Sequence, residues 1–158
     1  MNYPIAPNSV TEDQLQPHLR NRLKGYNVSL RYINESIAES KLPQIIAGET
    51  ITRGNAITFL SVNGDVQAFR SGLTSPANAI AYESGIAGES IRYTKTNSVE
   101  VDGASFVPGL DVFLVDGTPN LTTTLPSLSN KKYLQKLGVA LSLTSLSVMI
   151  EEAELFKV

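Results

Sequence analysis

Cysteine is absent from this chain of 158 residues, and histidine occurs once. The missing thiols exclude disulfides and cysteine-ligated metal sites. His18 stands between Pro17 and Leu19, which supply neither a nucleophile nor a ligand, and one histidine leaves only carboxylates to complete a three-ligand zinc site. We therefore expect His18 to be a surface or interface residue, and we expect no metal and no cofactor.

Long apolar runs and basic clusters are also lacking. No stretch approaches the roughly 18 apolar residues that a membrane-spanning helix needs. Lysine and arginine are spread thinly over a chain whose net charge is −2, which argues against a nucleic-acid partner. The segment Met1–Ile5 has neither a positive region nor an apolar core, so we expect no secretory signal. The hydrophobic fraction of 42% predicts a folded domain, and the length allows one domain plus an extension.

Catalytic motifs are scarce. The glycines form no phosphate-binding pattern, and Ser75 and Ser84 lack the flanking glycines of a nucleophile elbow. Glu49 with Glu89 is the best candidate for the paired carboxylates of a glycan hydrolase. Both glutamates occupy equivalent places in a repeated hexapeptide, however, where accepting hydrogen bonds from backbone N–H groups explains them equally well. We therefore predict that the chain is not an enzyme.

The repeated hexapeptide is the most informative feature present. Ile46–Ile51 (IAGETI) and Ile86–Ile91 (IAGESI) differ only in a Thr-to-Ser exchange. Glycine at the third position of the hexapeptide permits a positive φ or a close approach of another group. The β-branched residues of the hexapeptide favour an adjoining strand. We interpret the two copies as one motif that twice leads the chain into a β-strand.

Beyond Pro43 the pattern is that of many short strands separated by turns, which is typical of an antiparallel sandwich or barrel. The Asn-Gly pair in Asn63-Gly64-Asp65 predicts a hairpin, and Asp102-Gly103 predicts a second one. A third turn is expected at Asp116-Gly117, followed by a loop over 118–130. The expected strands are Ala56–Val62, Val66–Phe69, Val99–Val101, Ala104–Val107, Leu110–Val115, Gly138–Leu143 and Leu146–Glu151.

The N-terminal residues 1–10 predict an extended arm. Pro4 and Pro7 disfavour helix and bias the residues before them toward extended geometry. With Tyr3 and Ile5 they form an apolar segment that has no partner in the patterning of the chain. We predict that this arm, through Tyr3, Pro4, Ile5 and Pro7, attaches the protein to a larger assembly.

A short helical segment is expected after the arm. Apolar residues recur there with the alternating three- and four-residue spacing of a helical seam, which favours a helix over roughly 29–40. Alternation of Tyr26, Val28, Leu30 and Tyr32 leaves a strand open as the alternative for 26–33. A stripe this short is unstable on its own, so we predict that copies of the chain bury it against one another in a homotrimer. The expected trimer-interface residues are Leu19, Leu23, Tyr26, Leu30, Ile33 and Ile37.

Several short motifs over residues 44–155 resemble those of small capsid decoration or head-fibre proteins of tailed phages. The phrase from Ser9 to Leu15 is similar to the opening segments of trimeric phage fibres. The motifs that carry the resemblance are Ala47-Gly48-Glu49, Gly54-Asn55-Ala56, Ala77–Ala81 (ANAIA), Val107–Leu114 (VPGLDVFL) and Lys136–Leu141 (KLGVAL). The resemblance implies a β-rich, β-tulip-like protein, usually trimeric, on the outside of the phage head and without catalytic residues.

From these observations we expect a mainly β protein with two parts, an arm and helical attachment segment over 1–42 and a β-rich decoration domain over 43–158. The leading hypothesis is a structural virion protein, made in the host cytoplasm, that binds the major capsid protein or another virion protein on the head exterior. The alternative is a receptor- or glycan-binding fibre module that recognises a host-surface glycan through aromatic side chains. The candidates for that role are Tyr26, Tyr32, Tyr82, Tyr93 and Phe69. A third hypothesis is a capsid-bound glycan hydrolase that uses Glu49 and Glu89.

Overall fold

The computed structural model describes residues 41–73 and 75–157. Residues Leu42–Val158 form one compact unit. Its described residues form ten strands and no helix, so the prediction of a mainly β protein is confirmed. The described residues include no helix long and apolar enough to cross a membrane. The predicted arm and the predicted helical segment lie outside the described residues.

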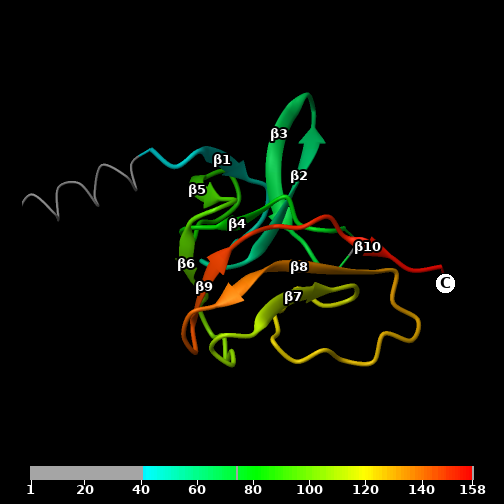
Figure 1. The fold of residues 1–158 in the computed structure, drawn as a ribbon. Helices are drawn as coiled ribbons and strands as arrows, with labels where there is room; N and C mark the ends of the chain where they lie inside the picture. The colour runs from blue at the N-terminus through cyan, green and yellow to red at the C-terminus, as the bar shows by residue number, and fades with distance from the viewer. Residues whose placement is uncertain (1–40, 74, 158) are drawn as a thin grey trace, which may run out of the picture. The chain divides into compact units, whose positions relative to one another are not determined.

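The first half of the unit is a closed five-stranded barrel in the order β1-β3-β2-β4-β5 (Figure 1). Most pairs are antiparallel, but β1 runs parallel to β3, with Ala47 opposite Ala68, while its other edge pairs with β5. One parallel pair therefore completes a barrel whose other pairs are antiparallel. The strands are β1 (Gln44–Ala47), β2 (Ala56–Val62), β3 (Asp65–Arg70), β4 (Ala79–Ala81) and β5 (Ser90–Thr94).

The two copies of the hexapeptide lie side by side and run antiparallel in this barrel. Ile46 is opposite Ser90, and the Ala47 carbonyl accepts a hydrogen bond of 2.7 Å from the Gly88 N–H. The second copy leads into β5, as expected. The first does not lead into a strand, because β1 ends at Ala47 and β2 begins only at Ala56.

The glycines of the two copies serve different purposes. Gly88 has a φ of +91°, which a side chain would strain. Gly48 has no positive φ; instead the Phe69 ring occupies the space that a Cβ atom would need. The same hexapeptide therefore supplies a turn in one copy and a close aromatic contact in the other.

The hairpin predicted at Asn63-Gly64 is confirmed. Both residues have a positive φ, 53° and 92°, as a type I′ turn requires, and the β2–β3 ladder runs from Ile57↔Arg70 to Val62↔Asp65. Figure 1 shows this hairpin projecting from the barrel.

The second half of the unit is a five-stranded sheet built around β8. This strand pairs with β7, β9 and β10, and β9 in turn pairs with β6. The register of β7 on β8 shifts between Val112 and Phe113, which leaves Leu137 as an extra residue in β8. The strands are β6 (Ser98–Glu100), β7 (Asp111–Val115), β8 (Tyr133–Ala140), β9 (Ser145–Val148) and β10 (Glu154–Leu155).

The hairpin predicted around Asp102-Gly103 is wrong. The turn itself forms, with a φ of +76° at Gly103, but residues 104–107 are not a strand. β6 pairs with β9 instead, with Val99 opposite Leu146, since both side chains are buried in the core of the second sheet. The strand predicted over Gly138–Leu143 also differs, because β8 begins at Tyr133 and ends at Ala140.

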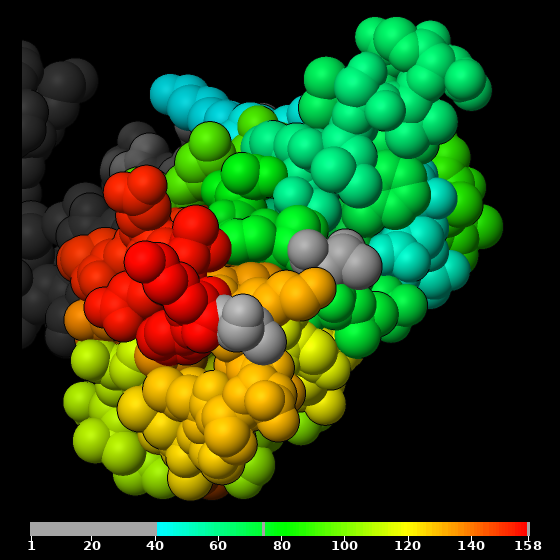
Figure 2. Space-filling model, turned by 90° about the vertical axis from the view of Figure 1, so that its right-hand side faces the viewer, coloured from blue at the N-terminus to red at the C-terminus, as the bar shows by residue number. Residues whose placement is uncertain are grey.

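The barrel and the second sheet have separate cores that share two barrel strands. Ile57 and Ala79 face the barrel interior, whereas their neighbours Ala56 and Ile80 belong to the core of the second sheet. This follows from the period of two in a β-strand, which turns successive side chains to opposite faces. In the space-filling view of Figure 2, the C-terminal residues lie beside the barrel residues, and the β2–β3 hairpin projects above them.

Candidate functional surfaces

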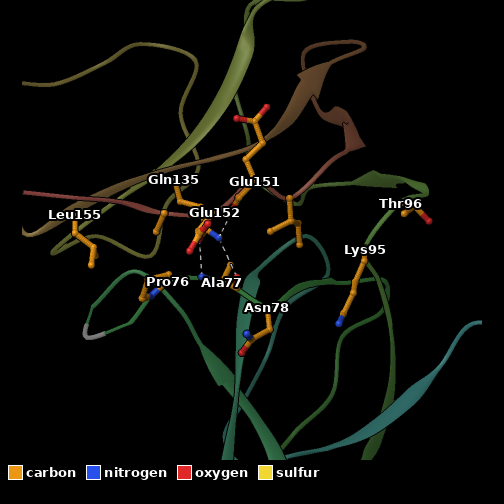
Figure 3. Close-up of a pocket in the computed structure, with 11 residues that line it drawn as sticks. Pro76, Ala77, Asn78, Lys95, Thr96, Gln135, Glu151, Glu152 and Leu155 are labelled. Atoms are coloured by element: carbon orange, nitrogen blue, oxygen red, sulfur yellow. Dashed lines mark hydrogen bonds between the residues drawn. The ribbon is translucent and has the colours of Figure 1, made fainter.

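A groove of about 670 Å³ lies between the barrel and the C-terminal segment (Figure 3). One wall comes from the segment before β4 and the loop after β5, and the other from the residues that follow β9. The lining residues are Pro76, Ala77, Asn78, Lys95, Thr96, Gln135, Ile150, Glu151, Glu152, Ala153 and Leu155.

Gln135 is the buried polar residue of this groove, and its amide makes three hydrogen bonds. Its Oε1 accepts a hydrogen bond of 2.7 Å from the Ala77 N–H, and its Nε2 donates to the carbonyls of Ala77 and Glu151 at 3.0 and 2.9 Å. A buried amide with three such bonds stabilises the position of its neighbours. Gln135 of β8 therefore joins the segment before β4 to the residues that follow β9.

The groove walls carry charges of both signs. Figure 3 shows Lys95 and Asn78 on the barrel side, while the Glu151 carboxylate points away from them. Glu151 lies 3.4 Å from Lys136 Nζ, and the Asn78 Oδ1 accepts the Phe59 N–H at 2.8 Å. The Lys95 ammonium lies 5.7 Å from the centroid of the Phe59 ring, and the Glu152 carboxylate is exposed, so the groove offers a ligand one charge of each sign.

A second hollow, of about 310 Å³, lies where the Asp102-Gly103 turn meets the barrel. Arg53 and Asp102 form an ion pair beside it, with Nη2 and Oδ1 2.6 Å apart. The hydrogen bond and charge of Asp102 raise the pKa of Arg53 above its ordinary value. Because both side chains are more than two-fifths exposed, this pair adds little to stability.

Glu49 and Glu89, the predicted hydrolase pair, both accept backbone hydrogen bonds. Glu49 Oε1 accepts the Arg70 N–H at 2.6 Å and lies 3.5 Å from the Arg70 guanidinium. Glu89 Oε2 accepts the Ile86 N–H at 2.9 Å within its own turn. These bonds account for both carboxylates as parts of the barrel framework. Among the described residues, no group of three or more His, Cys, Asp or Glu side chains could hold a metal ion.

The aromatic residues considered for glycan binding do not share one surface. Tyr93 packs on the barrel core and forms an edge contact with Phe59, with ring centroids 5.0 Å apart. Tyr82 packs against the other core, below the Arg92 guanidinium. Phe69 covers Gly48. The structure therefore does not bring Tyr82 and Tyr93 together as one platform, and Tyr26 and Tyr32 lie outside the described residues.

The remaining predicted site residues also lie outside the described part of the chain. They are the arm residues Tyr3, Pro4, Ile5 and Pro7, the seam residues Leu19, Leu23, Tyr26, Leu30, Ile33 and Ile37, and His18. Their roles stay predictions.

The structure adds a surface that the sequence reasoning missed, here called the apolar end surface: Val107, Leu110, Leu141 and Leu143 at one end of the second sheet. About half or more of each side chain is exposed, up to 63% for Leu143. Backbone bonds hold the two segments together, from the Phe106 N–H to the Leu143 carbonyl at 2.8 Å and from the Ala140 N–H to the Leu110 carbonyl at 2.9 Å. Figure 1 shows the β8–β9 turn beside the loop that precedes β7.

A sequence signal for this surface exists. Residues 104–110 and 137–150 contain no Asp, Glu, Lys or Arg, although such residues make up 18% of the chain. Exposed apolar side chains in a charge-free setting are typical of interaction surfaces.

Comparison with known proteins found no matching family model, no matching curated protein and no matching solved structure.

Proposed function

We propose that this chain is a structural virion protein that decorates the outside of a tailed-phage head, bound to the major capsid protein or another virion protein. The proposal includes a homotrimer and attachment through the arm residues Tyr3, Pro4, Ile5 and Pro7. Residues Leu42–Val158 supply the outward-facing β unit.

One observation carries this proposal: the short motifs that resemble decoration and head-fibre proteins hold framework positions of the fold. Gly48 lies under the Phe69 ring, a Cβ on Gly54 would meet Val101, and a Cβ on Gly138 would meet the Ser147 carbonyl. Three of the five motifs thus contain a glycine that a neighbouring group makes necessary. Residues of this kind determine the architecture of the β unit. A resemblance that rests on them therefore supports a structural role for the chain.

The test is the place and number of the chain in the virion of the phage that encodes it. Quantitative mass spectrometry of purified virions, with electron cryo-microscopy of the heads, should find many copies arranged on the head exterior. Absence from the virion would contradict the proposal. A few copies confined to the tail would contradict it as well and would favour the fibre module.

The second candidate function is a receptor- or glycan-binding module, and the groove beside Lys95 and Glu152 is what favours it. Lys95 and Glu152 lie there on opposite walls, and Ile150, Ala153 and Leu155 add apolar lining, a combination that suits sugars and peptides alike. Titration with host-surface glycans, comparing the natural chain with Lys95→Ala, separates the two functions. Binding that depends on Lys95 is expected only of the second.

A further inference from the structure

We infer that the groove between the barrel and the C-terminal segment binds an extended peptide, which adds as a strand to the edge of the residues that follow β9. The inference rests on the second candidate function only in taking the groove as a binding site, and it names the class of ligand. It does not depend on the phage role. A strand bound in this way gains affinity from backbone hydrogen bonds and specificity from its side chains.

The first step is an edge at which strand pairing stops. β6 pairs with β9, and one bond beyond this ladder runs from the Val148 N–H to the Asn97 carbonyl at 3.3 Å. Before Asn97 the chain bends away, and the Thr94 hydroxyl accepts the N–H groups of Thr96 and Asn97 at 3.2 and 2.9 Å. The groove opens at this point, with Thr96 on one wall and Ile150 on the other. No continuation of β6 therefore fills the place beside the residues after Val148.

The second step is the state of the backbone along this edge. Residues 149–153 contain no turn or bend. Glu151 directs both backbone groups at β8, because its N–H donates to a β8 carbonyl at 3.0 Å and its carbonyl accepts the Gln135 side-chain amide at 2.9 Å. Backbone groups of an extended segment alternate in direction, so those of Ile150 and Glu152 point to the opposite edge, which borders the groove. No group of the described residues bonds to them, so they are available to a peptide strand.

The third step is the charge and order of the walls. Figure 3 shows Lys95 toward the end where β6 begins, Leu155 at the far end, and Glu152 between them. A peptide in the place that β6 leaves runs antiparallel to residues 150–155, as β6 runs to β9. From its N-terminus it therefore presents an apolar residue beside Leu155, a basic residue beside Glu152 and an acidic residue beside Lys95.

A peptide fits these features better than a sugar does. Alternating free backbone groups along one edge match the repeat of a peptide strand, for which a sugar ring has no equivalent. The residues that line the groove, all of them described, include no aromatic side chain on which a sugar ring could stack. The apolar side chains of Ile150, Ala153 and Leu155 instead suit the aliphatic side chains of a peptide.

The test is binding to the full chain, with acetylated peptides of about six residues as the probe. Their sequences are random combinations of valine, threonine, lysine and aspartate. We expect the bound peptides to share valine near the N-terminus, lysine in the middle and aspartate near the C-terminus. The Lys95→Glu variant should bind them about tenfold more weakly and should prefer peptides with lysine in place of that aspartate. The matched control Lys131→Glu, in the loop before β8, should bind as the natural chain does, and equal thermal melts show that both variants fold.

A second measurement tests the strand geometry. Hydrogen exchange of the Ile150 and Glu152 N–H groups, followed by NMR, should slow by about tenfold or more when a selected peptide is added. Exchange at Gly64, on the β2–β3 hairpin tip, should not change. Methylating the peptide nitrogens one at a time should weaken binding at every second residue only, because alternate N–H groups face the edge.

The inference is overturned if no peptide of the pool binds, if Lys95→Glu binds like the natural chain, or if methylation weakens binding equally along the peptide. An array of neutral oligosaccharides is the second probe. Binding of oligosaccharides without peptides overturns the inference and leaves the second candidate function standing, whereas binding of neither overturns both. Head decoration is tested separately, by the place of the chain in the virion.

Discussion

At the scale of single residues, glycine is required where other groups approach the backbone most closely. Gly138 sits in β8 against the Ser147 carbonyl of β9, and an added Cβ atom would overlap that oxygen. Gly64 at the hairpin tip has a φ of +92° but open space around it. Gly138 also has a φ of +153°, so a side chain there would meet both a steric conflict and backbone strain, whereas at Gly64 it would meet backbone strain alone.

Replacing each glycine with alanine should therefore give different losses. We expect Gly138→Ala to lower the free energy of unfolding by about 3 kcal/mol, because the β8–β9 pairing has to shift. Gly64→Ala should cost only about 1 kcal/mol, the strain of a left-handed alanine. Urea denaturation of the two variants measures the difference, and equal losses would show that the β8–β9 contact can relax.

At the scale of elements, local turn chemistry was predictable and long-range pairing was not. Asn63-Gly64 fixes its own hairpin, because a type I′ turn joins the strands on either side of it. Asp102-Gly103 also makes a turn, yet the strand before it, β6, pairs with β9, some 45 residues later along the chain. Burial of Val99 against Leu146 favours this pairing over a local hairpin.

The first half of β8 could not be predicted for a related reason. Its pattern places Gln135 at a buried position, where an apolar residue would be expected in a strand. The bonds that make this burial tolerable come from Ala77 and Glu151, which are distant in sequence. Likewise, the exposure of Leu141 and Leu143 follows from where β8 ends, so only the charge-free composition of their surroundings was visible beforehand.

A titratable side chain of β8, Tyr133, forms a hydrogen bond with the segment between β3 and β4. The Tyr133 hydroxyl donates to the Ser75 carbonyl at 2.7 Å, and burial raises the pKa of Tyr133 to about 12 from its ordinary value of 10.0. Since the folded protein holds the proton more tightly, the stabilisation is fully present below pH 10.0 and is lost as the pH rises toward 12.

The natural chain should therefore lose stability between these pH values, and Tyr133→Phe should lose less over the same range. Denaturant unfolding at a series of alkaline pH values measures both curves. Parallel curves for the two proteins would show that Tyr133 ionises equally easily in the folded and unfolded chain.

At the scale of the whole molecule, the barrel and the second sheet depend on each other. Ala56 and Ile80 of the barrel fill the core of the second sheet, and Gln135 of β8 bonds to Ala77 just before β4. Shared packing of this kind makes the two halves one cooperative unit, and within the described part of the chain both cores are built from residues after Pro43.

A chain that begins at Leu42 should consequently fold by itself. We expect a single cooperative thermal transition and a circular dichroism spectrum typical of β structure. A broad melt without a cooperative transition would mean that residues before Leu42 contribute to the core.

We propose that this chain functions as an assembled structural protein, so its mass in solution should be that of an oligomer. Light scattering of the full chain at micromolar concentration should give three times the chain mass of 17.1 kDa, and Leu30→Asp or Ile33→Asp should lower it by placing a charge in the predicted seam. A natural chain that scatters as a 17.1 kDa monomer would contradict the account.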